Sequence, residues 1–208
     1  MRLQDEATIV FAGDSVTDAN KSADWNKLGS GYVRLVHDAL AAFYPQKRLR
    51  VVNAGISGDN SRDLLARWDR DVSAYSPDVL FCLIGINDVW RHFDKLDPEK
   101  PLVYEEEYER NIRSICEKGK ACKDFTLMTP YFIERNKSDE MLQMTLRYAE
   151  IARRTARACG VRVLELQPVF DEYMKSSSGL SISWDRVHPG NIGAMLIARA
   201  IVQNLENE

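Results

Sequence analysis

The sequence has no long apolar stretch, and neither sign of charge prevails in it. No uninterrupted hydrophobic run approaches the roughly 20 residues that a membrane-spanning helix needs, so we expect no membrane partner. The net charge is -3, both signs are scattered along the chain, and there is no basic stripe. Since nucleic-acid binding requires clustered positive charge, we also expect no nucleic-acid partner.

Cysteine and histidine are scarce as well. The four cysteines form no Cys-x-x-Cys pair, and the three histidines are scattered. A zinc site needs clustered ligands, so the sequence predicts no metal site. The charged first residues run straight into a short apolar segment, so we expect no signal peptide. Free thiols and the missing signal favour the cytoplasm.

Short apolar runs alternate with amphipathic segments along all 208 residues, with no repeat or linker. The runs are rich in Val, Ile, Leu and Phe, as in strands that are buried on both faces. We predict strands over 8–12, 50–53, 79–84, 125–128 and 161–166, and helices over 32–43, 61–75, 104–118, 139–158, 168–175 and 191–205. This order predicts a single domain, 1–208: a flavodoxin-like α/β/α sandwich of three layers around a five-stranded parallel sheet.

Polar motifs follow the first three predicted strands. They are Gly13-Asp14-Ser15, the run 53–59, and Gly85-Ile86-Asn87-Asp88. The carboxyl ends of parallel strands share one rim, where ligands bind to such sheets. The loop with Asp185 and His188 follows the fifth strand and can return to that rim. A turn of this spacing brings the carboxylate to one imidazole nitrogen and leaves the other free to act as a base toward Ser15.

Together these motifs resemble the SGNH family of serine hydrolases, also called the GDSL family. The four motif blocks of the family are matched by Gly13-Asp14-Ser15, Gly58, Gly85-x-Asn87-Asp88 and Asp185-x-x-His188. The longer strings 52–58, 84–91, 128–131 and 184–189 look like the bacterial intracellular acetylxylan-esterase branch. That branch removes acetyl groups from xylose-based oligosaccharides and is often oligomeric, so the resemblance implies such a substrate and a homo-oligomer.

The resemblance also implies roles for individual residues. Ser15 is the nucleophile, His188 the base, and Asp185 the group that orients the imidazole. The backbone N–H groups of Ser15 and Gly58 and the side-chain amide of Asn87 form the oxyanion hole. The chemistry requires no metal and no organic cofactor.

Residues beside the motif blocks are candidates for binding the substrate. They are Trp90, Arg91, Tyr131 and Trp184. Aromatic faces pack well on sugar rings, whereas the alternative is that the aromatic residues pack beneath the rim or at a subunit contact. Arg91 either meets substrate hydroxyls or pairs with nearby acids. A structural role is favoured for His92, and Asp88 is expected to cap the next segment.

The sequence thus predicts a serine esterase that hydrolyses O-acetyl esters of carbohydrates through an acetyl-serine intermediate. One alternative is an SGNH thioesterase or lysophospholipase that acts on longer acyl chains, although no extended apolar lid is visible. Another is a non-catalytic flavodoxin-like module, which would leave the pairing of Asp185 with His188 unexplained. A sugar-binding pseudoenzyme is disfavoured because every catalytic group is present.

Overall fold

A central parallel sheet organises the chain in the computed structural model, which describes residues 3–94 and 99–206. The strand order is β2-β1-β3-β4-β5, and every neighbouring pair is parallel. The strands are β1 (Thr8–Gly13), β2 (Arg50–Gly55), β3 (Val79–Leu83), β4 (Asp124–Met128) and β5 (Arg162–Leu164). The predicted five-stranded parallel sheet is therefore confirmed.

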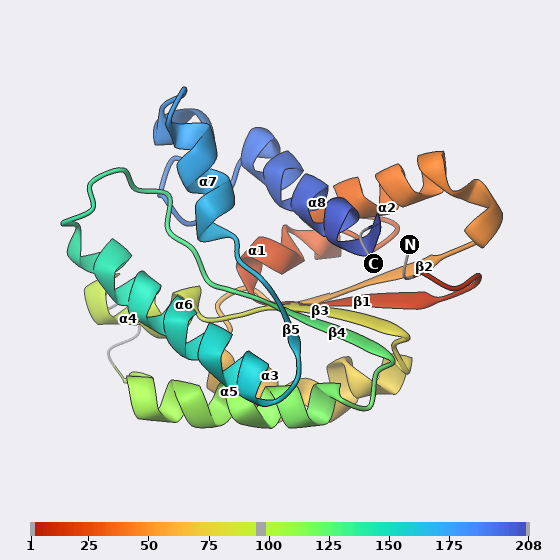
Figure 1. The fold of residues 1–208 in the computed structure, drawn as a ribbon, viewed down its shortest axis with the longest axis horizontal. Helices are drawn as coiled ribbons and strands as arrows, with labels where there is room; N and C mark the ends of the chain where they lie inside the picture. Colours follow the sequence, from red (N-terminus) through yellow and green to blue (C-terminus); the bar gives the residue numbers. More distant parts are fainter. Residues whose placement is uncertain (1–2, 95–98, 207–208) are drawn as a thin grey trace.

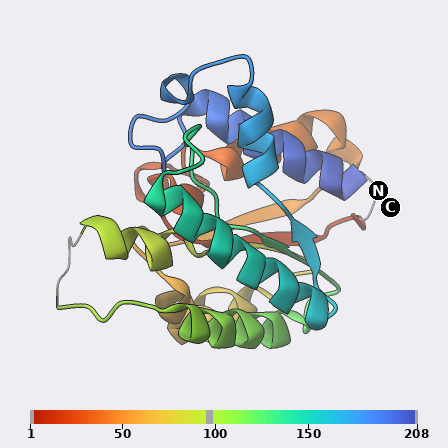
Figure 2. The same ribbon diagram turned by 60° about the vertical axis from the view of Figure 1, so that its left-hand side comes forward.

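Helices cover both faces of the sheet (Figures 1 and 2). One face carries α2 (Tyr32–Phe43), α7 (Gln167–Met174) and α8 (Asn191–Glu206). The other face carries α3 (Ser61–Asp71), α4 (Ile86–Asp94), α5 (Glu105–Gly119) and α6 (Glu140–Ala158). The short helix α1 (Ser15–Asp18) directly follows β1, and 3-10 turns lie at Lys21–Ala23, Pro45–Lys47, Ser73–Tyr75 and Gly179–Ser181. In the described residues, no helix is both long and apolar enough to cross a membrane.

Successive residues of a strand pack into two different cores. In β1, Val10 and Ala12 belong to the cluster beneath α3, α5 and α6, whereas Ile9 and Phe11 belong to the cluster beneath α2 and α8. All four side chains are fully buried. Because side chains alternate between the faces and both faces are covered, the strand reads as a continuous apolar run.

The register of the sheet brings the polar motifs to one level. Gly13, the last residue of β1, pairs with Gly55 of β2 on one side and with Leu83 of β3 on the other. The segments that follow these three strands therefore emerge side by side. A Cβ at position 13 would overlap the Thr17 side chain and the Leu83 carbonyl, so the close approach of α1 to β3 requires a glycine there.

Two helices were not predicted from the sequence. They are α1, which begins at Ser15, and α4, which begins inside the third motif at Ile86. Gly85, with φ +134°, makes the sharp change from strand to helix. Since Asn87, Trp90 and Arg91 are spaced i, i+3 and i+4 on α4, they share one face of the helix.

Candidate active site

Ser15, His188 and Asp185 form a continuous hydrogen-bonded chain at the rim of the sheet. Ser15 is the first residue of α1, and its Oγ lies 2.7 Å from Nε2 of His188, 173 residues further along the chain. Nδ1 of His188 lies 2.6 Å from Oδ2 of Asp185. When Nδ1–H donates to the carboxylate, Nε2 is left with its lone pair toward the hydroxyl. This is the arrangement that general-base activation of a serine requires.

The loop around Asp185 holds the carboxylate in place through its backbone. Oδ1 accepts hydrogen bonds from the N–H groups of Val187 (2.9 Å) and His188 (2.8 Å) and from the Ser183 hydroxyl (3.1 Å). The Asp185 side chain is 8% exposed, against 35% for His188. Burial alone would raise the pKa of Asp185, but the hydrogen bonds from His188 and Val187 outweigh it and hold the pKa below its usual value. The carboxylate is therefore ionised at neutral pH.

Two aromatic residues support this loop and the imidazole. The Trp90 ring meets the His188 ring edge-on, with 5.7 Å between their centroids. Tyr131 is buried beneath the loop, stacks on Phe170 and donates from its hydroxyl to the Val187 carbonyl at 3.2 Å. Trp184, which precedes Asp185, is 83% exposed. Of the predicted aromatic residues, Trp90 and Trp184 thus border the triad from outside, and Tyr131 lies under it.

Three hydrogen-bond donors lie at the ends of β1, β2 and β3, where the resemblance places an oxyanion hole. Gly58 has φ +86°, and a Cβ there would meet no heavy atom within 4 Å, so its backbone conformation rather than crowding favours glycine. Asn87 is 2% exposed, and its Nδ2 donates to the Asp59 carbonyl at 2.9 Å. Within residues 3–94 and 99–206, no group accepts a hydrogen bond from the N–H of Ser15 or Gly58.

The loop that carries Gly58 is fastened to α1. Oδ2 of Asp18 accepts from the backbone N–H (3.1 Å) and the hydroxyl (2.9 Å) of Ser57, and Lys21 donates to the Gly55 carbonyl. The Nδ2 of the buried Asn53 donates to the carbonyls of Thr17 and Leu28. These contacts set the position of Gly58 relative to Ser15. Asn53, Gly55 and Ser57 lie in the motif 53–59, whereas Asp18 and Lys21 lie outside the motifs that the sequence analysis considered.

A buried arginine that the sequence analysis missed ties the strand ends together. Arg67 is 7% exposed and donates to the carbonyls of Gly13 and Ala54, each at 2.9 Å, and to Oδ2 of Asp59 at 2.5 Å. It therefore joins β1, β2 and the segment after Gly58. The sequence did contain a signal for the burial of Arg67, because this residue lies three residues after Leu64 on the apolar face of α3.

Two buried carboxyl groups lie next to the candidate catalytic residues. Asp14 caps α1 by accepting from Val16 N at 2.9 Å, and its Oδ2 has no hydrogen-bond partner in the described residues. Burial raises the pKa of Asp14 to about 7; the Val16 N–H opposes the shift, and the nearby Asp88 and Asp59 carboxyls add to it. Asp88 accepts from Ser61 N and Oγ, so it binds the first residue of α3, whose N-cap is Asn60, and does not cap the segment that follows it. Burial raises its pKa to about 7 as well, against these hydrogen bonds.

These raised pKa values predict that stability falls between about pH 5 and pH 8. In that range the folded protein holds a proton on Asp14 that the unfolded chain has lost, so the free energy of unfolding decreases as pH rises. The free energy of unfolding decreases by roughly 3 kcal/mol over this range for each such carboxyl. Asp14→Asn should lower the difference between urea unfolding free energies measured at pH 5 and pH 8. The exposed Asp69→Asn variant is the control, and an unchanged difference in Asp14→Asn would contradict the assignment.

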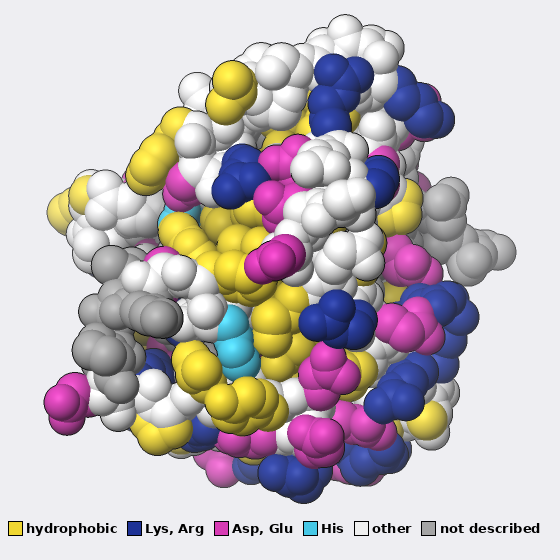
Figure 3. All heavy atoms as spheres, turned by 90° about the vertical axis from the view of Figure 1, so that its left-hand side faces the viewer, with side chains coloured by type: hydrophobic (Ala, Val, Ile, Leu, Met, Phe, Trp, Pro, Cys, Tyr) yellow, Lys and Arg dark blue, Asp and Glu magenta, His cyan; other side chains and the backbone are white. Residues whose placement is uncertain are grey.

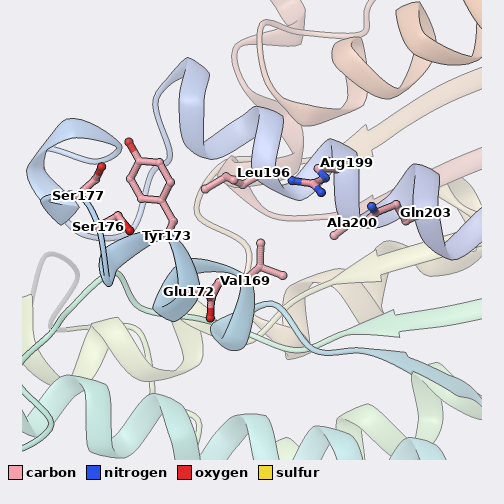
Figure 4. A pocket seen from close by; sticks show the side chains of 9 residues that line it. All are labelled: Val169, Glu172, Tyr173, Ser176, Ser177, Leu196, Arg199, Ala200 and Gln203. Atoms are coloured by element: carbon pink, nitrogen blue, oxygen red, sulfur yellow. The ribbon is translucent and has the colours of Figure 1, made fainter.

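The surface at the rim is hollowed. Figure 3 views the molecule from the side where the strands end and shows hydrophobic side chains gathered in a hollow, with acidic, basic and histidine side chains around it. A separate surface hollow of about 380 Å³ lies between α7 and α8 (Figure 4) and is lined by residues such as Tyr173, Leu196 and Arg199. That hollow includes none of the triad residues, so it is not the site described above.

The fold and the site define the class of protein. A flavodoxin-like parallel sheet that presents a serine, a histidine and an aspartate at its carboxyl rim is typical of a serine hydrolase of the α/β type. The profile of the GDSL-like lipase/acylhydrolase family matches residues 11–196. The chain belongs to this family, and it is a carboxylic ester hydrolase.

Relatives of known structure share the fold over their whole length. The acetylxylan esterase of Geobacillus stearothermophilus is 38% identical over 211 residues, which cover 99% of this chain and 96% of that enzyme. The crystal structure of that organism's acetylxylan esterase Axe2 has a TM-score of 0.94 and covers 100% of this chain and 98% of its own. LAE5, an α/β hydrolase from the metagenome of Lake Arreo, is 38% identical with a TM-score of 0.93, and the match covers 100% of both chains. Catalytic mutants of Axe2 with a serine, a histidine or an aspartate replaced by alanine have also been solved.

Proposed function

We propose that the protein removes O-acetyl groups from carbohydrates, most specifically from acetylated xylo-oligosaccharides, with Ser15, His188 and Asp185 as its catalytic triad. The observation that carries this proposal is the unbroken contact from Ser15 Oγ through the imidazole to the Asp185 carboxylate, at 2.7 and 2.6 Å. The substrate class is supported by the full-length similarity to an acetylxylan esterase.

The reaction proceeds in two halves. His188 Nε2 takes the proton of Ser15 while Oγ attacks the acetyl carbonyl, and the resulting imidazolium gives that proton to the departing sugar oxygen. The ester C–O bond breaks and acetyl-serine remains. A water molecule then loses its proton to His188 and attacks the acetyl carbon. The imidazolium returns the proton to Ser15 Oγ, and acetate leaves.

Negative charge builds up on the carbonyl oxygen in each half of the reaction. The N–H groups of Ser15 and Gly58 and Nδ2 of Asn87 are the proposed donors to that oxygen. Each of them comes from the end of a different strand, and the register of Gly13 with Gly55 and Leu83 places those ends together. Such donors are already oriented before the reaction, so they stabilise the transition state without reorganising.

The aromatic residues at the rim suit a sugar. Trp184 is largely exposed beside Asp185, and Trp90 lies against the His188 ring. We assign these two residues to contact with the carbohydrate. Tyr131 is assigned to support of the triad loop, because its hydroxyl already donates to the Val187 carbonyl and its side chain is buried.

The choice between short and long acyl groups is tested by substrate comparison. We expect 4-nitrophenyl acetate to be hydrolysed at least about tenfold faster than the octanoyl ester, because one methylene alone is worth roughly 10-fold or more in a fitted pocket. Acetate release should be highest from acetylated xylo-oligosaccharides among acetylated sugars, peptides and lipids. Faster octanoyl cleavage, or release confined to lipids, would favour the thioesterase or lysophospholipase alternative.

We also propose that residues 1–208 act as one catalytic domain in the cytoplasm and that the protein forms a homo-oligomer. Four free cysteines fit a reducing compartment. Large apolar side chains at the surface, with Trp25 at 94% and Leu180 at 77% exposure, fit a contact between subunits. Light scattering coupled to size-exclusion chromatography measures the oligomeric state directly, and a mass of 23.8 kDa would contradict an oligomer.

A further inference from the structure

We propose that Arg91 is a positioning residue that fixes and polarises the Asn87 amide and acts through it on the reacting ester. Its terminal nitrogen Nη2 donates to Oδ1 of Asn87 at 2.9 Å, across one turn of α4. The inference rests on the proposed function, because it assumes that Asn87 donates to the oxyanion. In this inference Arg91 does not contact the substrate, as the sequence analysis considered, but acts on it through Asn87.

The two ends of the Asn87 amide have chemically opposite partners. Oδ1 faces a guanidinium, which can only donate, and Nδ2 faces the Asp59 carbonyl, which can only accept. A flipped amide would set donor against donor and acceptor against acceptor. Because Asn87 is 2% exposed, water cannot compensate for such a flip. Arg91 therefore selects the orientation in which Nδ2 faces the segment after Gly58, with one of its two hydrogens left for a ligand.

Arg91 is itself held in position. Its Nη1 pairs with the Asp94 carboxylate three residues further along α4, and its guanidinium lies over the Trp90 ring, 5.2 Å from the centroid. The side chain is 20% exposed, so its charge is only partly screened by solvent. Trp90 in turn packs against His188. The same face of α4 thus carries the proposed oxyanion donor, its cationic partner and a neighbour of the base.

The positive charge at Oδ1 makes the Nδ2–H group a stronger donor, because hydrogen bonds in a chain polarise one another. The gain is largest when the substrate oxygen carries most charge, which is in the transition state. Loss of Arg91 should therefore lower kcat and kcat/KM together and leave KM nearly unchanged. A contact between Arg91 and sugar hydroxyls would instead raise KM, and only for sugar substrates.

The experiment compares Arg91→Met and Arg91→Lys on two substrates, 4-nitrophenyl acetate and an acetylated xylobiose. The first substrate has no sugar, so a sugar-binding role predicts no change with it. We expect Arg91→Met to lower kcat about tenfold on both, less than the loss of at least about 100-fold for Asn87→Ala. The kcat of Arg91→Lys should lie between the values for the wild type and Arg91→Met, because an ammonium can donate to Oδ1 but cannot span both Asn87 and Asp94.

A double-mutant cycle separates this role from general damage to the fold. In the Asn87→Ala background, Arg91→Met should lower kcat by less than about threefold, since the amide through which Arg91 acts is gone. Arg153→Met is the matched control, because Arg153 makes an equivalent i,i+3 ion pair with Glu150 on α6. Unchanged kcat on 4-nitrophenyl acetate in Arg91→Met, or the same tenfold loss with and without Asn87, would overturn the inference. A wild-type protein that is inactive and not labelled by a fluorophosphonate would instead overturn the proposed function.

Discussion

Ser15→Ala is expected to abolish labelling by a fluorophosphonate probe and to lower ester turnover by roughly 10⁴- to 10⁶-fold. The reason is that Oγ is the atom in contact with His188 Nε2, and alanine leaves the base with no proton to take. Labelling is followed by in-gel fluorescence and turnover by release of 4-nitrophenol. The loss should appear in kcat far more than in KM, because the hydroxyl acts in the chemical step.

The control for this variant is Ser114→Ala. Ser114 is exposed on α5, where its hydroxyl donates, within the part of the chain that the structure describes, only to the Arg110 carbonyl of its own helix, so labelling and turnover should stay at the wild-type level. Since the Ser15 side chain is small and partly exposed, thermal unfolding should change little in Ser15→Ala. Persistent labelling of Ser15→Ala would place the nucleophile at another residue.

Asp185→Asn is expected to lower kcat by about 10⁴-fold while the protein stays folded. The carboxylate accepts from Nδ1 of His188, and its low pKa keeps it ionised for that task. An amide in this position can turn its NH2 toward Nδ1, which forces the proton onto Nε2 and leaves no lone pair for Ser15. Because Oδ1 accepts from two backbone N–H groups, the amide oxygen can still hold the loop.

The measurement for Asp185→Asn combines kinetics with circular dichroism, which reports whether the fold is intact. Asp69→Asn serves as the matched control, since Asp69 is exposed and pairs only with Lys118 among the described residues. Turnover within about threefold of the wild type in Asp185→Asn would remove Asp185 from the triad. A probe rate that falls together with turnover would support its action through His188, because the same base activates Ser15 toward the phosphonate.

The strands were predictable because their pattern is local. Thr8–Gly13 and Val79–Leu83 are short apolar runs flanked by polar residues, and burial on both faces is enough to produce such runs. The helix α2 was predicted with its observed bounds because its apolar residues recur at helical spacing. By contrast, α4 was missed, since Asn87 and Asp88 after a glycine resemble a turn and no capping residue precedes Ile86.

The contacts of the site divide in the same way into local ones, which the sequence predicts, and remote ones, which depend on the fold. Asp185 and His188 lie three residues apart, so their pairing is a property of one loop. The approach of Ser15 to His188 depends on the whole sheet, because the two are 173 residues apart. Likewise, nothing in the order of residues states that Arg67 binds the carbonyls of Gly13 and Ala54. Such contacts arise only when helix α3 packs on the sheet.

Residue identity and short-range spacing therefore decide which groups can react and which segments become strands or helices. The tertiary structure decides which of those groups meet. It brings the ends of β1, β2 and β3 to one level, and it places Arg67 against the carbonyls of Gly13 and Ala54. The physical reason is that periodicity and turn chemistry act over a few residues, whereas the close packing of helices on the sheet sets every distance between remote parts of the chain.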